Sequence, residues 1–150
     1  MAFVASVKIQ GLKETQSTFV NIGKYIKKTR NTLKRAIKYM KETTEGQVFN
    51  TRGGSIGKKW ASLSPAYRAW KASKYPGKGI LQRTGKMRGN FKTKVSNTQA
   101  ELSNPTKYFK YHQLGTRKMP QRVVLYVDDR REKKVIDMFS EDSEKILNKK

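Results

Sequence analysis

Apolar and polar residues alternate at the start of the chain. Between residues 3 and 9 every second side chain is apolar, which is the period of a half-buried strand, and Gly11 ends this pattern. From about residue 13 to residue 47 the period lengthens to that of a helix, with apolar residues three, four or about two turns apart. The spacing predicts one long helix with a single apolar stripe. That stripe consists of Phe19, Ile22, Ile26, Leu33, Ile37, Met40 and Val48.

The middle of the chain begins with residues 50–59, NTRGGSIGKK, which are rich in glycine and in basic side chains. Such a composition predicts a mobile loop. It lacks the order of a phosphate-binding P-loop, because Lys59 stands where that motif requires Ser or Thr. In the next segment, LSPAYRAWKAS, Ser64 is suited to cap a helix and Pro65 to occupy its first position. We therefore expect a short helix, which KYPGKG then ends.

Shorter segments predict the remainder of the fold. ILQRTGKMRGNF is typical of a helical turn that ends at Gly85 and leads into a strand from about residue 90 to residue 96. SNTQ then predicts a polar turn, and AELSN the partner strand of a hairpin. Farther on, RVVLYVDD predicts a short apolar strand, and Asp128 or Asp129 can cap a final helix. We expect the buried side of that helix to hold Val135, Ile136, Phe139, Ile146 and Leu147.

The order strand, long helix, short helix, strands and helix predicts an α+β fold. In this fold a small antiparallel sheet is packed by a long N-terminal helix and a C-terminal helix. A chain of 150 residues suffices for one domain with its own core. Residues 1–150 are therefore expected to form a single unit, with the basic Gly-rich loop at 50–59 within it.

The chain is strongly basic, with 34 Lys and Arg against 11 Asp and Glu and a formal charge of +23. Such a charge attracts phosphate polymers, anionic lipid or acidic protein faces. No acidic residue occurs between Glu45 and Glu101, whereas acids and bases balance from Asp128 onward. The polar face of the long helix and the Gly-rich loop are therefore either solvated surfaces or contacts to DNA or an acidic partner. The candidate contacts are Lys24, Lys27, Lys34, Lys38, Arg52, Lys58 and Lys59.

Cysteine is absent, which excludes disulfides, thiolate metal sites and cysteine nucleophiles. The N-terminal residues carry no cationic segment before an apolar run, and no window reaches the ~18 apolar residues that span a bilayer. These features predict a soluble protein without a membrane partner, which stays in the cytoplasm until it joins an assembly.

Candidate catalytic chemistry is confined to His112, the only histidine, in the stretch YFKYHQLGTRKMPQR. Acid–base or nucleophilic catalysis needs a partner group close to this imidazole. The acids are concentrated near the C-terminal end, and no GxSxG elbow is present. No HExxH motif, EF-hand loop or carboxylate cluster points to a metal. We therefore expect no enzymatic activity, no cofactor and no metal, and we interpret His112 as a packed or interfacial residue.

Nucleic-acid binding is the alternative that the composition supports. Basic residues alternate with aromatic ones between Tyr67 and Tyr111. Aromatic rings can stack on unpaired bases while Lys and Arg neutralise backbone phosphates. No sequence-reading motif accompanies them, so the alternative is a sequence-independent nucleic-acid-binding protein.

Four short elements follow the long helix in order: G..W..L at residues 57–63, IL..TG.M at 80–87, Y...HQ.G at 108–115 and P.R at 120–122. In this order they resemble the phage virion morphogenesis, or tail-completion, family, over about residues 50–127. Met87 stands where that family has Leu. The matching residues that we expect to matter for packing are Trp60, Leu63, Leu81, Thr84, Gly85, Tyr108, His112, Gly115, Pro120 and Arg122.

The resemblance implies a non-enzymatic structural subunit of the head-tail junction of a tailed phage, assembled in the host cytoplasm and then part of the virion. It implies a homo-oligomeric ring, with a hexamer favoured over a dodecamer. Its neighbours would be head-completion, portal-side, tail-tube or tail-terminator proteins. The basic charge would face the packaged DNA, without sequence specificity, or an acidic protein ring.

The same motifs also have a physical interpretation. Trp60, Leu63 and Leu81 are apolar anchors, and each fully buried side chain of this kind contributes about 1.5–3 kcal/mol. Gly85 and Gly115 stand at chain reversals that favour a left-handed backbone, which glycine adopts without steric cost. We expect the stretch around His112 to connect the hairpin to the last strand, with Pro120 and Arg122 setting that strand and Tyr108 and His112 packing inward or at a subunit border.

Overall fold

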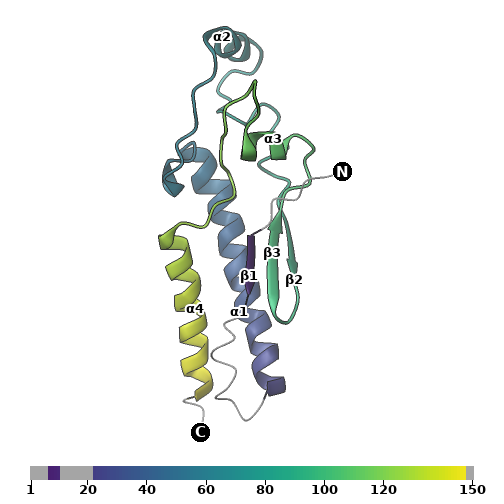
Figure 1. Ribbon diagram of the computed structural model, residues 1–150, viewed down its shortest axis with the longest axis vertical. Coiled ribbons are helices and arrows are strands. Elements are labelled where there is room, and N and C mark those ends of the chain that lie inside the picture. The colour runs from purple at the N-terminus through teal and green to yellow at the C-terminus, as the bar shows by residue number, and fades with distance from the viewer. Residues whose placement is uncertain (1–6, 11–21, 148–150) are drawn as a thin grey trace.

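Helix α1 (Ile22–Thr43) is the central element of this computed structural model, which describes residues 7–10 and 22–147, with side chains from residue 29 to residue 146. Helix α4 (Asp129–Leu147) lies on one side of α1 and a small sheet on the other (Figure 1). The short helices α2 (Pro65–Lys74) and α3 (Phe109–Leu114) lie at one end of the elongated molecule. This arrangement confirms the predicted α+β class.

The sheet has three antiparallel strands, β1 (Val7–Gln10), β2 (Lys92–Val95) and β3 (Gln99–Ser103), in the order β1-β3-β2. Ala100 and Leu102 of β3 are fully buried, and they alternate with more exposed neighbours as a strand with one covered face requires. The N-terminal strand, predicted from the alternation of residues 3–9, and the hairpin, predicted from the polar turn SNTQ, are both confirmed. Residues 3–6 of the predicted first strand lie outside the described residues.

The apolar stripe of the long helix is buried as predicted from Leu33 onward, while the side chains of Phe19, Ile22 and Ile26 lie outside the described ones. Leu33, Ile37 and Met40 are buried in the core, and Val48 joins them beyond a π-helical turn, η2 (Thr44–Val48). A π turn takes up an additional residue, so Val48 stays on the face of Met40 although eight positions separate them. The predicted residues 13–21 of this helix lie outside the described residues.

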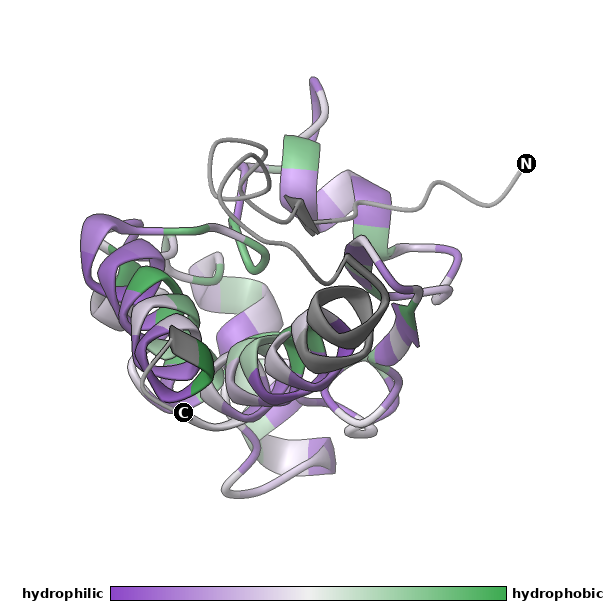
Figure 2. Ribbon diagram, turned by 90° about the horizontal axis from the view of Figure 1, so that it is seen from below, coloured by the Kyte–Doolittle hydropathy of each residue, from purple (hydrophilic) through white to green (hydrophobic). Residues whose placement is uncertain are grey.

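Helix α4 packs along α1 through a small apolar cluster of Ala36, Val135 and Met138. Figure 2, a view along the two helices, shows hydrophobic positions of both turned toward the space between them. Phe139 packs against this cluster as predicted, but the prediction for Ile136 is wrong, because this side chain is 45% exposed. The face toward α1 follows residues three and four apart, which selects Met138 in its place. Ile146 is half-buried, and the side chain of Leu147 lies outside the described ones.

Polar contacts also hold α1 and α4 together. The Asp142 carboxylate accepts hydrogen bonds from the Thr32 hydroxyl and from Arg35 Nη1, the latter at 2.8 and 2.9 Å. Burial alone would raise the pKa of Asp142, but these hydrogen bonds and the Arg35 charge lower it overall. At the other end of α4, Asp128 precedes the helix, yet its carboxylate pairs with the buried Arg131 at 2.9 Å. Asp128 thus contributes its backbone carbonyl, which accepts from Glu132 N, to the start of the helix.

Two local predictions are wrong. The segment from residue 80 to residue 85 forms turns and bends without a helical turn, and residues 122–127 form no strand and do not join the sheet. The Gln113 side chain takes the place of a neighbouring strand. Its Oε1 accepts from Val124 N and Leu125 N at 2.9 and 3.0 Å, and its Nε2 donates to Leu125 O at 2.8 Å. Gln113 belongs to α3, a helix that lacks a capping side chain and was not predicted.

The glycine-rich segment predicted as a loop is a hydrogen-bonded turn that includes the short 3-10 helix η3 (Gly54–Ile56). Gly53 N donates to Val48 O at 2.8 Å, and Trp60 N donates to Arg52 O at 2.8 Å. The Trp60 ring lies directly on Gly53 and meets Phe49 edge to face at 5.5 Å between centroids. A side chain at position 53 would therefore collide with the ring.

We predict that Gly53→Ala lowers the free energy of unfolding by about 3 kcal/mol, because its φ of 78° is left-handed and a Cβ would lie 2.1 Å from Lys58 O and 2.7 Å from the Trp60 ring. Gly57→Ala is the matched control, since its φ is 66° but nothing lies within 4 Å of the added carbon. That variant should lose only about 1 kcal/mol. Urea denaturation measures both, and equal losses would contradict the steric role of Gly53.

Candidate functional site

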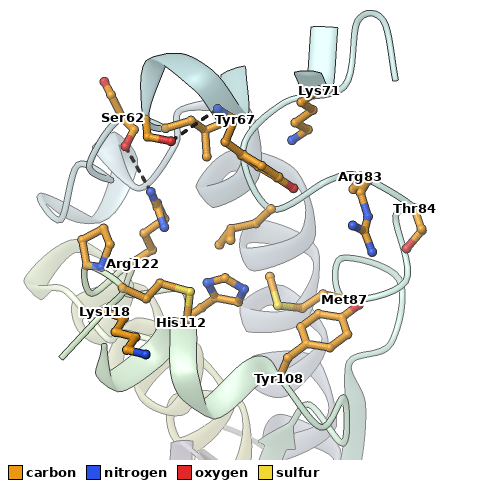
Figure 3. Close-up of a pocket in the computed structure, with 15 residues that line it drawn as sticks. Ser62, Tyr67, Lys71, Arg83, Thr84, Met87, Tyr108, His112, Lys118 and Arg122 are labelled. Atoms are coloured by element: carbon orange, nitrogen blue, oxygen red, sulfur yellow. Dashed lines mark hydrogen bonds between the residues drawn. The ribbon is translucent and has the colours of Figure 1, made fainter. Parts of the chain in front are cut away.

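A cavity of about 720 Å³ opens at the end of the molecule that carries α2 and α3. Figure 3 shows side chains from the start of α2, from the turns at residues 81–87 and from the region of α3 pointing toward this common hollow. Most residues of the four sequence elements meet here, although they are far apart in the chain. Those that line the cavity are Leu63, Leu81, Thr84, Met87, Tyr108, His112, Pro120 and Arg122.

The remaining motif residues support the walls. Trp60 lies in the core and donates from Nε1 to Val123 O at 2.6 Å. Gly115 has a φ of 75°, and a Cβ there would lie 3.0 Å from Gln121 N, so the turn after α3 closes only over a glycine. Gly85 has a φ of 74°, as a chain reversal requires. Both glycine predictions are confirmed.

Helix α2 presents one face to the cavity. Ser64, Tyr67 and Lys71 are three and four residues apart, so they lie on the same side of this helix, and all three line the cavity. The start of α2 is as predicted, because Ser64 accepts a hydrogen bond from Tyr67 N at 3.4 Å and Pro65 occupies the first turn. These local signals place Lys71 two turns into the helix, beneath the turn at Gly79.

Two cations of the cavity are buried. Arg122 is 5% exposed, and it donates from Nε to Ala61 O at 3.0 Å and from Nη2 to Ser62 O at 3.2 Å (Figure 3). Lys71 is 4% exposed and donates to Gly79 O. Burial lowers the pKa of both groups, and the charges of Arg83 and Arg122 lower that of Lys71 further. None of the described residues that line the cavity is acidic, so no carboxylate there balances these charges.

His112 lines the cavity and is half-buried, with its ring edge to face against Tyr108 at 6.2 Å between centroids. Its Nδ1 is buried and has no hydrogen-bond partner among the described residues. Burial and the nearby Arg122 charge lower the pKa of His112, which keeps the imidazole neutral near pH 7. In the described part of the chain, no group of three His, Cys, Asp or Glu side chains could hold a metal ion.

Leu81 is one of the described non-glycine residues with a positive φ, at 61°. A left-handed backbone at a bulky apolar residue is strained, and such strain occurs where surrounding structure imposes it. Here the strained residue lines the cavity and packs its side chain against the main core. The left-handed backbone thus directs the Leu81 side chain inward, where it forms an apolar part of the cavity wall.

The predicted contacts to DNA or an acidic partner lie elsewhere. Lys34 and Lys38 are exposed on α1, while Arg52, Lys58 and Lys59 are exposed on the glycine-rich turn. Lys38 is 3.8 Å from Glu42, and Lys58 stands 4.9 Å from the centroid of the Tyr126 ring. Side chains of Lys24 and Lys27 lie outside the described ones. None of the five described ones lines the cavity.

No sequence pattern identified Lys71, Arg83, Lys118 and Tyr67 as members of a common site. The signal for Lys71 was its position on the same helical face as Ser64 and Tyr67. No comparable signal exists for Arg83 and Lys118, because they follow turns whose directions only the folded chain determines.

We predict that the stability of the protein falls between about pH 7 and about pH 5, and that His112→Phe removes part of this fall. The His112 pKa is lowered in the folded protein, so below about pH 6.5 the unfolded chain binds more protons and gains relative stability. Thermal melts of both proteins at half-unit steps measure the effect. The pKa of Asp142 is lowered, so this carboxyl stays ionised over the same range and does not contribute to the change in stability. Parallel pH profiles would show that the burial of His112 does not affect its protonation.

The chain was compared with known proteins. Residues 10–142 match the phage virion morphogenesis family. No curated protein and no solved structure matches the chain. None of the described helices is long and apolar enough to cross a membrane. The family match includes α1, the whole cavity and nearly all of α4. The chain therefore belongs to the phage virion morphogenesis family, whose proteins have structural or assembly roles in the phage particle.

Proposed function

We propose that the protein is a structural subunit of a tailed-phage head-tail junction, as part of a neck or tail-completion ring that joins or seals the DNA-filled head to the tail. Membership in the virion morphogenesis family supports a structural or assembly role. Such a role requires surfaces that contact other proteins persistently, and these surfaces must be apolar enough to associate in water.

One apolar surface carries the proposal. Tyr67 and Trp70 of α2, together with Tyr108, Tyr111 and Leu114 at α3, are large side chains that remain exposed, and we call them the α2–α3 surface. Tyr67 and Trp70 stack on each other at 5.3 Å between centroids. Tyr67 and Tyr108 both line the cavity, so the cavity lies between the two halves of this surface. Aromatic residues concentrated in this way are typical of protein interfaces.

The basic face of α1 supports a second contact. Arg30, Lys34 and Lys38 are exposed along this helix, at the opposite side from its buried stripe. In a ring, such a face can meet the packaged DNA or an acidic neighbour, because both carry the compensating charge. Arg35 of the same helix is paired with Asp142 of α4 and contributes less to that field.

A sequence-independent nucleic-acid-binding protein is the second candidate function. The observation that favours it is the exposed Tyr67–Trp70 stack beside the exposed Arg68 and Lys74 of the same helix. Aromatic faces next to cations can hold single-stranded nucleic acid. The ring proposal requires the chain to associate with copies of itself, whereas nucleic-acid binding does not.

We predict that the purified protein, alone or with its virion neighbours, forms closed rings, with six subunits favoured over twelve. Native mass spectrometry and negative-stain imaging measure the assembly. Trp70→Ser and Tyr111→Ser should each weaken it at least tenfold, because they remove apolar area from the α2–α3 surface. Tyr126→Ser is the control, as an equally exposed aromatic outside that surface. A strict monomer that binds one nucleic-acid sequence at least a hundredfold better than random sequences would contradict the proposal.

We predict that the double variant Lys34→Glu and Lys38→Glu folds normally but weakens DNA binding at least tenfold and reduces the yield of infectious phage. Both side chains are exposed, so the free energy of unfolding should change by no more than about 0.5 kcal/mol. Lys133→Glu with Lys134→Glu, on the exposed side of α4, changes the net charge equally and is the control. Unchanged yield in both variants would exclude an anionic partner at α1.

A further inference from the structure

The cavity holds more positive charge than its own residues neutralise. Lys71 and Arg122 are more than nine-tenths buried, and the hydrogen bonds of the described residues connect them only to backbone carbonyls. A buried cation without a carboxylate nearby reduces the stability of the fold, because it has lost its hydration. Groups that are kept at such a cost often serve a ligand.

Two further cations stand around these buried ones. Arg83 and Lys118 are exposed, and their side chains also line the cavity. A concave site with cations on several sides and low-polarity walls concentrates their field at its centre. That field favours an anion that enters the cavity over one that stays on the surface.

Part of the cavity lining is apolar, and we call this part the floor. Leu63, Leu81, Met87, Met119 and Pro120 all line it. Its volume of about 720 Å³ is large enough for several side chains of another molecule. Methionine adapts its shape to different apolar groups, which suits a site filled by a flexible segment. A hydrated ion alone would leave this floor uncovered.

His112 provides a second, independent sign of a ligand. Its Nδ1 is buried at the cavity and lacks a hydrogen-bond partner among the described residues. Buried polar atoms are nearly always hydrogen-bonded, since an unmade bond costs stability. A neutral imidazole can donate one hydrogen bond from this nitrogen to an incoming carboxylate.

We propose that this cavity is a socket for an acidic segment of another protein, in which a carboxylate lies next to an apolar side chain. The carboxylate pairs with Lys71 and Arg122, and the apolar side chain covers the methionine-rich floor. The inference rests on the proposed function only in taking that protein to be a virion neighbour. The exposed aromatic residues Tyr67 and Tyr108, which also line the cavity, extend the contact along the segment.

Other occupants fit less well. A nucleic-acid backbone is best matched by exposed cations along an open track, whereas the two central cations here are buried above an apolar floor. A second copy of the chain offers few acids to these cations, with 11 Asp and Glu against 34 Lys and Arg. Some of its acids are also already paired, as Asp142 is with Arg35 and Asp128 with Arg131.

The test uses the full-length protein and short acetylated peptides that contain one Asp or Glu between Leu or Phe residues. Matched peptides carry Asn or Gln in place of the acid. We expect the acidic peptides to bind at least tenfold more tightly by isothermal titration calorimetry, and Lys71→Met to abolish this preference. Lys74→Met, on the same helix but outside the cavity, should retain it. Without peptide, Lys71→Met should melt at a higher temperature than the natural protein, because a buried unpaired charge has been removed.

Arg83→Met serves as a second variant, since Arg83 is exposed and its replacement leaves the core intact. It should also weaken the preference for acidic peptides. Equal binding of acidic and amide peptides, or a preference that survives both substitutions, would overturn the proposal. Tighter binding of a single-stranded oligonucleotide or of inorganic phosphate, lost in Lys71→Met, would overturn it in favour of a phosphate site. Calorimetry measures peptide binding and native mass spectrometry measures ring formation, so failure of the socket and failure of the ring are observed separately.

Discussion

The contact between Trp60 and the backbone around it is the interaction on which the rest of the structure depends. The ring packs edge to face on Phe49, at the end of the long helical segment, and it covers Gly53 so closely that no other residue fits there. Its Nε1 also donates to Val123 O across 63 positions of sequence. One side chain thereby joins the central helix, the glycine-rich turn and the segment before α4. These contacts of Trp60 position the end of the molecule that carries α2.

The cavity forms because hydrogen bonds to α3, and not a fourth strand, hold the segment that follows the Gly115 turn. Gln113 satisfies the backbone of Val124 and Leu125, while Arg122 N donates to His112 O at 2.7 Å. These bonds keep the segment after the Gly115 turn beside α3, and the Arg122 side chain then reaches the carbonyls of Ala61 and Ser62. Arg122 therefore has two roles, because the same side chain links the segment to the α2 region and leaves its charge in the cavity wall.

Acidic residues are distributed unevenly in this fold, and this distinguishes its two basic regions, the exposed face of α1 and the cavity. Acids of α4 neutralise part of the long helix, as the contact of Asp142 with Arg35 shows, and Asp128 neutralises the buried Arg131. No described acid reaches the cavity, where Lys71 and Arg122 remain buried. In a family of virion assembly proteins, an interior charge of this kind is a stronger indication of a partner than exposed lysines, because burial makes an unpaired charge costly while solvent screens it at the surface.

Much of the fold followed from local patterns. The stripe of Leu33, Ile37 and Met40, the hairpin strand at AELSN, the Ser64-Pro65 helix start and the left-handed turns at Gly85 and Gly115 are set by residues close in sequence, so the sequence alone determined them. The four short elements also indicated the family. Only the tertiary structure decided that Val124 and Leu125 pair with a glutamine side chain, and that Ile136 faces water while Met138 is buried. Only it brought Lys71, Arg83 and Arg122 around one cavity. The physical reason is that these hydrogen-bond partners and charged groups come from distant parts of the chain. Local periodicity shows which residues share a face of one helix or strand, but not which distant residues meet.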